Sequence, residues 1–459
     1  MEKMLTEKNL NKYNASTPRY TSYPPANFFA ESFSESDYRL AIEASNTQHP
    51  EHISIYIHIP FCFHMCYYCG CNSVQMQGKD AVDSYMDALK KEIKIALPLL
   101  SKERKVSQIH YGGGSPSILP VRQIREINDL ILSYFTCIED PEIAIECHPG
   151  YLDEQYWRDL AKAGFNRISI GVQDFDQEVL KASNRKASRM DVAHILDILR
   201  AEGVSVNMDF IFGLPKQTVS SFAHTIEKAV AMGPDRLVTF SYAHVPWVNQ
   251  LQLKLEEIGL PPSLEKEKMY SNASSILEES GYKAIGMDHF VLPKDELYIA
   301  SESKSLHRNF QGYCTRRTTG QVYAFGVTGI SQLAMAYSQN TKDIQEYIER
   351  TNRGELPVLR GYILNEQEQI AREVISNLMC SYNINWGNIA TLFGVSVDEV
   401  KGAMNYDDRA LQVFAADGII HYDSDHISMP PHAKALVRNV AASLDKLMLN
   451  TDKHFSKTI

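Results

Sequence analysis

Four cysteines lie close together near residue 65, and their spacing is the strongest chemical signal in the chain. Cys62, Cys66 and Cys69 form a C-x3-C-x2-C pattern, and Cys71 follows two residues later. Three thiolates this close can ligate three irons of a [4Fe–4S] cluster and leave the fourth iron open for a small chelating cofactor. Zinc prefers four closed tetrahedral ligands, usually drawn from two separated pairs, and a buried inert group is the other alternative. The spacing favours the cluster, and Cys71 receives no ligand role because it lies too close to Cys69.

Polar and glycine residues recur at the ends of short apolar runs further along the chain. YGGGSP (111–116) ends one run, and Glu146, Gln173 and Asp209 lie at or near the ends of the next three. Carboxylates and amides suit a cationic ligand, and glycines let the backbone approach a cofactor closely. If these runs are parallel strands of one barrel, the residues meet at its C-terminal face, where such barrels carry their active sites.

The segments that position these residues alternate in a regular way. β-branched and apolar runs predict six strands, at residues 52–59, 106–111, 142–147, 167–172, 205–212 and 236–242. Helical patterns lie between them, for example at 81–100 and 220–233. The alternation predicts an α/β fold, in which a parallel sheet buried on both faces curls into a partial (β/α)6 barrel.

The regions outside this pattern predict two further units. An N-terminal arm over residues 1–50 precedes the barrel and its extension over 51–360. The arm is irregular, but its segment PRYTSYPPANFF (18–29) is rich in proline and aromatic residues, which favours an extended wrap over the larger body. A mostly helical domain is expected over 361–459.

The C-terminal unit resembles a winged helix. Residues 368–380 have helical periodicity, 388–404 read as helix, glycine turn and helix, and 418–430 read as a β-hairpin. Residues 365–444 contain ten acidic side chains and five Lys or Arg, whereas DNA readers usually carry the opposite charge. We therefore expect a lid or docking module that does not bind nucleic acid.

The composition excludes several classes of protein. Apolar residues make up 44% and charged residues 22% of the 459 residues, which is typical of a globular chain and not of a disordered one. The net charge of -10 gives no bulk attraction for nucleic acid or anionic lipid. No leader and no membrane span is recognised, and clustered cysteines suit a reducing compartment, so the expected location is the cytoplasm.

The cysteine loop resembles that of the radical S-adenosylmethionine (SAM) enzymes. In that superfamily the open iron chelates SAM, whose reductive cleavage yields a 5′-deoxyadenosyl radical. Nearly the whole chain resembles the oxygen-independent coproporphyrinogen III oxidases, also called coproporphyrinogen III dehydrogenases. The segments that carry this resemblance are PRYTSYP (18–24), YIHIPFC (56–62), CGCN (69–72), GVQDF (171–175), GLPKQT (213–218), GMDHF (286–290) and HRNFQGY (307–313).

The resemblance implies a [4Fe–4S] cluster on Cys62, Cys66 and Cys69 and two bound SAM molecules. The residues implied for one SAM are Tyr56, Gly113, Glu146 and Ile330. The residues implied for the second are Tyr68, Gly114, Ser115, Gln173, Arg185, Asp209 and Ala243.

The reaction implied is the oxidative decarboxylation of two propionate side chains of coproporphyrinogen III to vinyl groups, which gives protoporphyrinogen IX in heme biosynthesis. No catalytic residue of the protein is assigned, because the cofactor carries the radical. The substrate has several carboxylates, so cationic anchors are expected. Arg308, Arg316 and Arg317 are the candidates, since the arginine fork binds carboxylates bidentately.

The family also implies a monomer that works with an electron donor and acceptor that the sequence does not identify. The alternative is a radical-SAM-like heme chaperone, which binds the cluster and heme without oxidising coproporphyrinogen. Relatives of that kind usually lack the fourth cysteine and the arm, so Cys71 and PRYTSYP (18–24) favour the enzyme. A zinc-stabilised structural protein is the third interpretation. Two segments depart from the oxidase pattern near the expected substrate mouth, at 147–152 and 314–325.

Overall fold

A large mixed sheet forms the centre of the molecule, seen in a computed structural model that describes residue 9 and residues 12–457. Neighbouring parallel strands make up its middle. They are β13 (Gln321–Phe325), β1 (Ile53–Ile59), β4 (Val106–Gly113), β5 (Cys137–Cys147), β6 (Arg167–Gln173), β7 (Ser205–Phe212) and β8 (Arg236–Ser241). Antiparallel strands extend both edges. They are β14 (Ile330–Gln332), β15 (Ala336–Asn340) and β16 (Val358–Ile363) beyond β13, and β10 (His289–Val291) and β9 (Lys283–Ile285) beyond β8.

The six strands predicted from the sequence are confirmed as β1 and β4 to β8. Strand β1 shows why the strands could be predicted from apolar runs. All its residues except Tyr56 are buried, as a continuous apolar run predicts. The prediction omitted β13, the parallel partner of β1. Its run QVYAF (321–325) is short and pairs with a strand more than 260 residues earlier, so local sequence does not reveal the partner.

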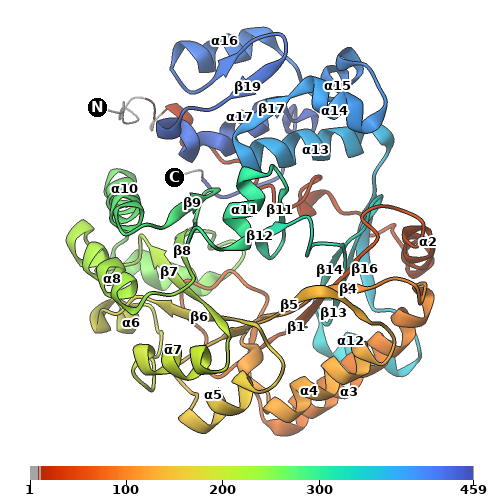
Figure 1. Ribbon diagram of the computed structural model, residues 1–459, viewed down its shortest axis with the longest axis vertical. Coiled ribbons are helices and arrows are strands. Elements are labelled where there is room, and N and C mark those ends of the chain that lie inside the picture. The colour runs from red at the N-terminus through yellow and green to blue at the C-terminus, as the bar shows by residue number, and fades with distance from the viewer. Residues whose placement is uncertain (1–8, 10–11, 458–459) are drawn as a thin grey trace.

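Helices cover the outer side of this curved sheet (Figure 1). Those that connect the parallel strands are α3 (Lys79–Ala96), α4 (Val121–Leu132), α5 (Glu154–Ala161), α6 (Gln177–Ala182), α7 (Val192–Ala201) and α8 (Val219–Met232). Asp153, Asp191 and Thr218 cap the N-termini of α5, α7 and α8 by accepting backbone N–H groups. No helix among the described residues is both long and apolar enough to cross a membrane.

Further elements complete the outer layer and the extension of the barrel. They are α2 (Glu35–Ser45), β2 (Phe61–Cys62), β3 (Val74–Gln75), α9 (Leu253–Ile258), α10 (Ser263–Glu279), α11 (Glu296–Glu302), β11 (Leu306–Asn309), β12 (Gly312–Thr315) and α12 (Ile344–Asn352). Strands β2 and β3 pair only with each other, and β11 and β12 form a separate hairpin.

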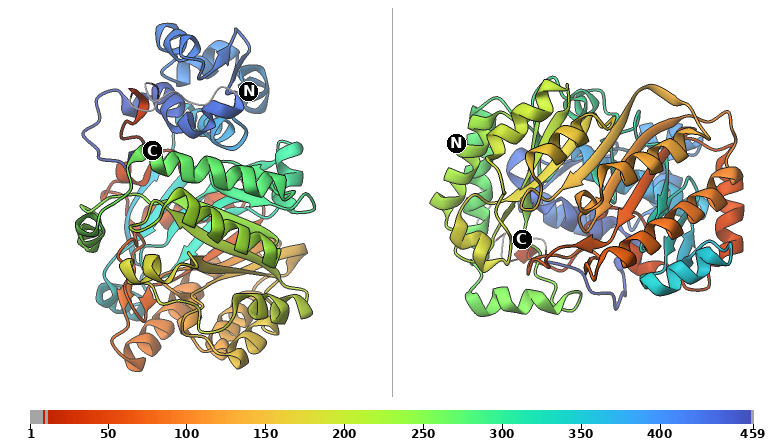
Figure 2. Two further views of the ribbon diagram at one scale, coloured as in Figure 1. Left: turned by 90° about the vertical axis from the view of Figure 1, so that its left-hand side faces the viewer. Right: turned by 90° about the horizontal axis from the view of Figure 1, so that it is seen from below.

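The C-terminal elements form a helical layer at one end of the barrel (Figure 2). The helices are α13 (Glu366–Ser381), α14 (Trp386–Phe393), α15 (Val397–Ala403), α16 (Asp408–Ala416) and α17 (Val437–Leu444). A small sheet joins β17 (Asn383–Asn385), β19 (His426–Ser428) and β18 (His421–Tyr422), in that order. Gly394 ends α14 in the left-handed region at φ 67°, as the predicted glycine turn requires. The predicted α/β class with a helical C-terminal region is therefore confirmed.

The N-terminal arm packs against this C-terminal layer. Tyr13, Tyr20 and Tyr23 are buried in the same apolar cluster as residues of α13 and α17. The hydroxyl groups of Tyr20 and Tyr23 donate to the buried Asp445 carboxylate, at 2.9 and 3.0 Å. The arm is thus held in place by the far end of the chain.

Candidate active site

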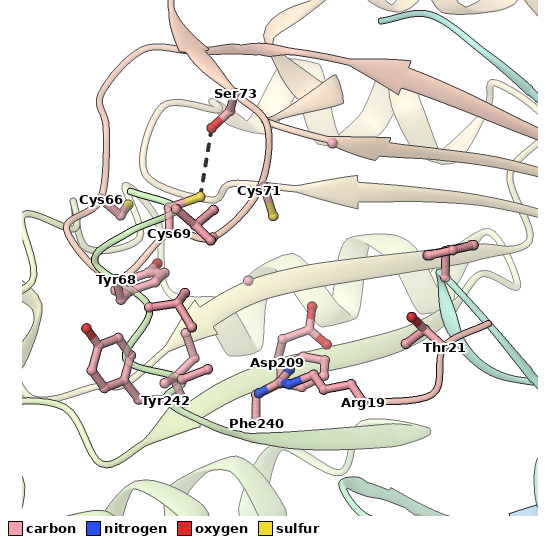
Figure 3. A pocket seen from close by; sticks show the side chains of 18 of the residues that line it. Arg19, Thr21, Cys66, Tyr68, Cys69, Cys71, Ser73, Asp209, Phe240 and Tyr242 are labelled. Atoms are coloured by element: carbon pink, nitrogen blue, oxygen red, sulfur yellow. Dashed lines mark hydrogen bonds between the residues drawn. The ribbon is translucent and has the colours of Figure 1, made fainter. Parts of the chain in front are cut away.

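A cavity of about 1000 Å³ lies at the C-terminal ends of the parallel strands. Its walls come from the cysteine loop, the ends of β4 to β8, the N-terminal arm and the C-terminal tail. Figure 3 shows the cysteine loop together with Asp209 and with Arg19 of the arm. Ligand pockets measure about 300–1,000 Å³, so this one is at the upper end of the range. Its lining contains many of the residues proposed from the sequence. They are Cys62, Cys66, Tyr68, Cys69, Gly114, Gly113, Ser115, Glu146, Gln173, Arg185, Asp209 and Ala243.

The cysteine loop is closed at its base by the β2–β3 ladder. The backbone N–H of Val74 donates to the Pro60 carbonyl, and that of Met76 donates to the Cys62 carbonyl, each at 2.8 Å. The His58 Nε2 group donates to the carbonyl of Asn72 at 2.9 Å. Strand β1 therefore fixes both ends of the loop that carries the thiols.

Side chains from the segments after α6 and after β8 hold the tip of the loop. Asn184 donates to the Met65 carbonyl at 2.9 Å. From the segment after β8, Asn249 donates to the Cys69 carbonyl at 2.9 Å and Gln252 donates to the Tyr68 carbonyl at 3.1 Å. The loop is thus tied to opposite sides of the barrel mouth, which orders the three cysteines without a ligand.

The thiols of the C-x3-C-x2-C pattern have different surroundings. Arg185 Nη1 donates to Cys66 Sγ at 3.7 Å, and Cys69 Sγ lies 3.8 Å from Ser73 Oγ. The pKa of Cys69 is lowered to about 6, chiefly by a hydrogen bond with Cys71. Burial, together with the nearby Cys69 and Cys66, raises the pKa of Cys62 to about 12, so a positive charge at the site would favour its thiolate.

The loop sulfurs do not form a compact tetrahedral site. Tetrahedral zinc with Zn–S bonds of about 2.3 Å holds its sulfurs about 4 Å apart. Within the described part of the chain, no three of the loop sulfurs lie within 4.8 Å of one another.

Glu146 is held at the end of β5 by two aromatic residues from neighbouring strands. Its Oε1 lies 3.0 Å from His110 Nε2, and the His110 ring stacks on Tyr56 with centroids 6.0 Å apart. Burial alone would lower the pKa of His110, but the Glu146 carboxylate outweighs burial and raises that pKa. Tyr56 lies behind this pair and does not line the cavity, and Ile330 packs with the apolar cluster around Tyr337.

Glycines at the end of β4 allow this close approach. A Cβ on Gly114 would lie 2.7 Å from the Pro60 carbonyl oxygen, and one on Gly113 would lie 2.8 Å from the His58 ring. Gly113 also has φ 114°, which side chains rarely tolerate. These contacts bring the YGGGSP turn against the base of the cysteine loop.

Several buried polar atoms in the second group of proposed residues have no partner. Tyr68 Oη, Gln173 Oε1 and Arg185 Nε are buried without a hydrogen bond in the structure. Gln173 also adopts φ 70°, a strained conformation that is often found at binding sites. A Cβ on Gly171 would lie 2.7 Å from Gln173 Nε2 and 3.0 Å from Arg185 Nη2, so glycine leaves room for both side chains. Orphaned polar atoms around a cavity indicate a missing ligand.

Asp209 lies at the centre of this wall. Ser169 donates to its Oδ2 at 2.7 Å, while burial raises the pKa of Asp209 to about 6. A cationic ligand would return this carboxyl to its charged form.

The three arginines proposed as substrate anchors do not line the cavity. Arg316 pairs with Glu373 at 2.6 Å and Arg317 pairs with Glu296 at 3.0 Å, so both are occupied by carboxylates of the protein. Arg308 is buried on β11, with its guanidinium carbon 4.7 Å from the centroid of the Tyr313 ring.

Other cavity residues were not singled out from the sequence. They are the arm residues Thr17, Arg19 and Thr21, the pair Phe310 and Gln311, the exposed Trp247 and Val248, and the tail residues His454, Phe455 and Ser456. The arm and the segment HRNFQGY (307–313) carry part of the family resemblance. That resemblance was a signal from which the arm residues, Phe310 and Gln311 could have been proposed. Nothing in the composition of the tail indicates that it reaches the cavity.

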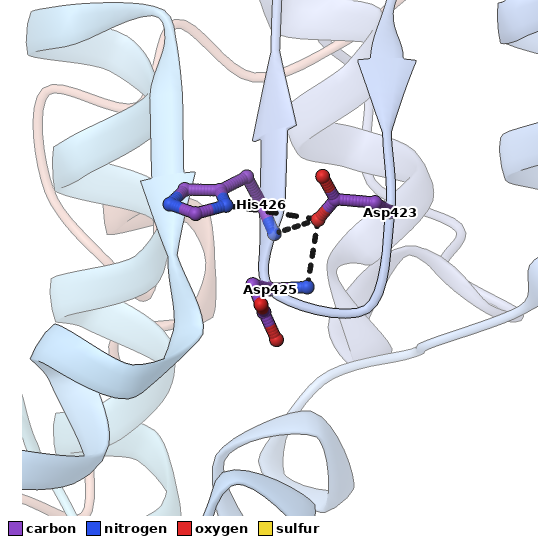
Figure 4. Close-up of side chains that lie close together, drawn as sticks. All are labelled: Asp423, Asp425 and His426. Atoms are coloured by element: carbon purple, nitrogen blue, oxygen red, sulfur yellow. Dashed lines mark hydrogen bonds and ion pairs between the residues drawn. The ribbon is translucent and has the colours of Figure 1, made fainter.

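Away from the cavity, the turn between β18 and β19 brings together Asp423, Asp425 and His426 (Figure 4). Their ligand atoms lie within 4.8 Å of one another. The Asp423 carboxylate accepts the backbone N–H groups of Asp425 and His426, each at 2.8 Å. These bonds are those of an exposed hairpin turn, and they account for the cluster without an ion.

Known proteins resemble the chain over nearly its full length. Residues 56–229 match the model of the radical SAM superfamily. The oxygen-independent coproporphyrinogen III oxidase of Synechocystis sp. is 39% identical over 98% of this chain and 97% of its own length. The enzyme of the same name from Escherichia coli K12 is 37% identical over 95% of this chain and 94% of its own length.

A solved structure has a similar fold. It is that of the coproporphyrinogen III oxidase of Escherichia coli, described as a radical SAM enzyme. The TM-score is 0.87 at 35% identity, covering 97% of this chain and 100% of the other. The similarity therefore extends through the arm and the C-terminal layer as well as the barrel.

Proposed function

This chain belongs to the oxygen-independent coproporphyrinogen III oxidases of the radical SAM superfamily, and we propose which of its residues perform the reaction. It is a radical SAM oxidoreductase with a [4Fe–4S] cluster and SAM as cofactors. It converts two propionate side chains of coproporphyrinogen III to vinyl groups, a step of heme biosynthesis. The names of the relatives support this activity and not that of a heme chaperone.

Cys62, Cys66 and Cys69 hold the cluster in this proposal. Support comes from their position on one ordered loop above the cavity and from the Arg185 guanidinium at Cys66 Sγ. A cationic donor beside the sulfurs stabilises a thiolate-bound, negatively charged group. Cys71 is exposed toward the cavity and keeps no ligand role.

The proposal assigns SAM to the two groups of residues around the cavity. When bound, the cluster and SAM supply the one-electron chemistry that removes hydrogen from a propionate side chain. Glu146 and Asp209 offer carboxylates to the sulfonium and ammonium charges, and Gln173 and Tyr68 offer unsatisfied polar atoms. A second SAM molecule is part of the proposal, and the size of the cavity supports it.

The protein's own contribution is binding, orientation and exclusion of water. Gly113 and Gly114 let the β4 turn approach the cysteine loop. The arm and the tail contribute to the lining of the cavity, where they help to restrict the access of water to a reactive intermediate. No protein side chain is needed as a general base for this role.

The test is anaerobic reconstitution of the full chain with iron and sulfide, followed by incubation with SAM, a reductant and coproporphyrinogen III. Formation of vinyl product together with 5′-deoxyadenosine is expected. Formation of 5′-deoxyadenosine alone would keep the radical chemistry and exclude the substrate. Serine variants of Cys62, Cys66 and Cys69 are expected to lose bound iron, while Cys71→Ser keeps it. If Cys71→Ser were the only one of the four variants to lose iron, the ligand assignment would be wrong.

A further inference from the structure

Arg19 is the charged residue among those of the N-terminal arm that line the cavity (Figure 3). Its Nη2 donates to the Ser241 carbonyl at 3.5 Å, the outer limit of a hydrogen bond. The side chain forms no ion pair with a carboxylate of the described residues. The residue is exposed where it lines the cavity. A guanidinium with several N–H donors still available can receive an anion there.

The C-terminal helix α17 holds this part of the arm rigidly. Arg438 is buried, and its Nε donates to the Pro18 carbonyl at 3.1 Å, directly before Arg19. Its other nitrogens donate to the carbonyls of Thr17, Ser456 and Lys457. On the other side of Arg19, Tyr20 is anchored on Asp445. The position of Arg19 is therefore set on both sides by buried hydrogen bonds.

Positive charges predominate around Arg19. Lys266 lies close enough for its pKa to be lowered to about 8 by burial and then by Arg19. Arg308 is also within electrostatic range, and its Nε and Nη1 are buried without hydrogen-bond partners. Asp288 is the carboxylate that faces Arg19, and its Oδ1 is already bound to His289 Nδ1 at 2.7 Å. Lys266 and Arg308 lie behind the cavity lining, and together with Arg19 they outnumber the one carboxylate, Asp288, among these groups.

The same cavity also carries carboxylates. Glu146 and Asp209 line it and suit the cationic SAM. Coproporphyrinogen III carries four propionates, which are ionised at neutral pH and need cationic partners of their own. Arg19 is a cationic group of the arm that lines the cavity and can supply one.

We infer that Arg19 binds a propionate carboxylate of the tetrapyrrole substrate through its guanidinium nitrogens. This inference rests on the proposed function. The carboxylate of SAM has the same chemistry, and the arms of the experiment distinguish the two carboxylates. Arg308 reinforces the site from behind the wall, whereas Arg316 and Arg317 are paired elsewhere.

The experiment measures binding without turnover. Reconstituted holoenzyme with SAM and no reductant is titrated with coproporphyrin III, the stable oxidised form of the substrate with all four carboxylates, and fluorescence is recorded. Arg19→Ala is expected to raise Kd by about tenfold or more, because it removes charge-assisted hydrogen bonds. Arg19→Lys is expected to fall between wild type and Arg19→Ala. The control is Arg353→Ala, an exposed arginine that pairs with Glu355 outside the cavity.

Iron content and binding of labelled SAM are measured on the same samples, and both are expected to be unchanged in Arg19→Ala. If wild type and Arg19→Ala bind coproporphyrin III within twofold of each other, the inference is wrong while the proposed function stands. If SAM binding falls and coproporphyrin binding does not, Arg19 belongs to the SAM site and the inference is again wrong. If wild type neither binds coproporphyrin III nor converts the reduced substrate, the proposed function itself fails.

Discussion

Asp209 is a carboxyl group whose charge depends on what occupies the cavity beside it. Its pKa is raised to about 6, chiefly by burial and also by the nearby Glu146, while the hydrogen bond from Ser169 opposes the rise. A side chain in this condition is partly protonated just below neutral pH and becomes ionised when a cation approaches. The same residue type on the surface would titrate near its ordinary value of about 4 and could not couple ligand binding to pH in this range.

We therefore predict that SAM binding weakens below pH 6. Because the cation requires the ionised carboxylate, affinity is expected to fall by up to about tenfold for each pH unit below the pKa of Asp209. Equilibrium dialysis of labelled SAM against reconstituted protein from pH 5 to 8 measures this. Asp209→Asn should bind weakly with a flat profile, and Ser169→Ala should move the inflection to higher pH. A wild-type profile that is flat between pH 5 and 7 would contradict the role of Asp209.

At the scale of elements, the end of β4 and the cysteine loop are built as one unit. The Gly114 N–H donates to the Ile59 carbonyl at 2.8 Å, and the Ser115 N–H donates to the Phe61 carbonyl at 3.0 Å. A Cβ on Gly114 would lie 2.7 and 2.9 Å from the Pro60 and Phe61 oxygens, which belong to the backbone and cannot swing aside. The position of the first thiol thus depends on the absence of one methyl group.

Gly114→Ala is expected to reduce the iron bound after reconstitution to well below the wild-type amount. The methyl group would push the β4 turn away from the segment that leads into Cys62, so the three thiols would no longer meet the cluster together. Iron and sulfide analysis measures the loss, and circular dichroism checks the fold. Gly402→Ala is the matched control, since nothing lies within 4 Å of the added carbon. Full iron content in Gly114→Ala would refute this account of the turn.

Another element-scale feature is the buried Glu92 on α3, which joins the barrel to its extension. It accepts hydrogen bonds from the backbone N–H of Gly326 at 2.8 Å, from Asn340 at 2.6 Å and from the Tyr347 hydroxyl at 2.5 Å. Burial nevertheless raises its pKa to about 7, above the usual 4.5. The folded state therefore binds this proton more tightly than the unfolded state does.

The consequence is a specific pH dependence of stability. The Glu92 proton contributes to the free energy of unfolding. This contribution is fully present below about pH 4.5, decreases as pH rises through 7, and is absent above that. It is on the order of 3 kcal/mol across this window. The melting temperature is measured at pH 5.5 and at pH 8 for each protein. The difference between the two values is expected to be smaller in Glu92→Gln than in wild type, whichever protein is more stable. An equal difference in both proteins would show that Glu92 does not titrate in this range.

At the scale of the whole molecule, residues distant in sequence complete the site, and this limited what the sequence could predict. The six parallel strands could be predicted because their β-branched residues are buried on both faces of the sheet. The cysteine loop could be predicted from the spacing of its cysteines alone. The tail residues His454 to Ser456 line the cavity although nothing local marks them. Arg316 was a reasonable anchor by type, but its partner Glu373 lies 57 residues away on α13. Pairings of this kind depend on the packed fold and not on local patterns.

The arm is therefore part of the active site only while the C-terminal layer holds it. Asp445 is buried and accepts both the Tyr20 and the Tyr23 hydroxyl groups. Asp445→Ala would leave two buried phenol groups without an acceptor, at a cost of about 1–3 kcal/mol for each unpaired group. Because Arg19 lies next to Tyr20, we expect its recognition of substrate to be lost with the anchor.

Two measurements check this last prediction. Limited trypsin digestion should cleave Asp445→Ala after Arg19 much faster than wild type, and coproporphyrin III should bind it about as weakly as Arg19→Ala. Iron content should remain at the wild-type value, since the cysteine loop is tied to β1, α6 and the segment after β8 rather than to the arm. Asp452→Ala removes an exposed carboxylate of the same tail and serves as the control. If the arm of Asp445→Ala stays resistant to trypsin, other contacts such as those of Arg438 are sufficient to hold it, and the anchor role of Asp445 is wrong.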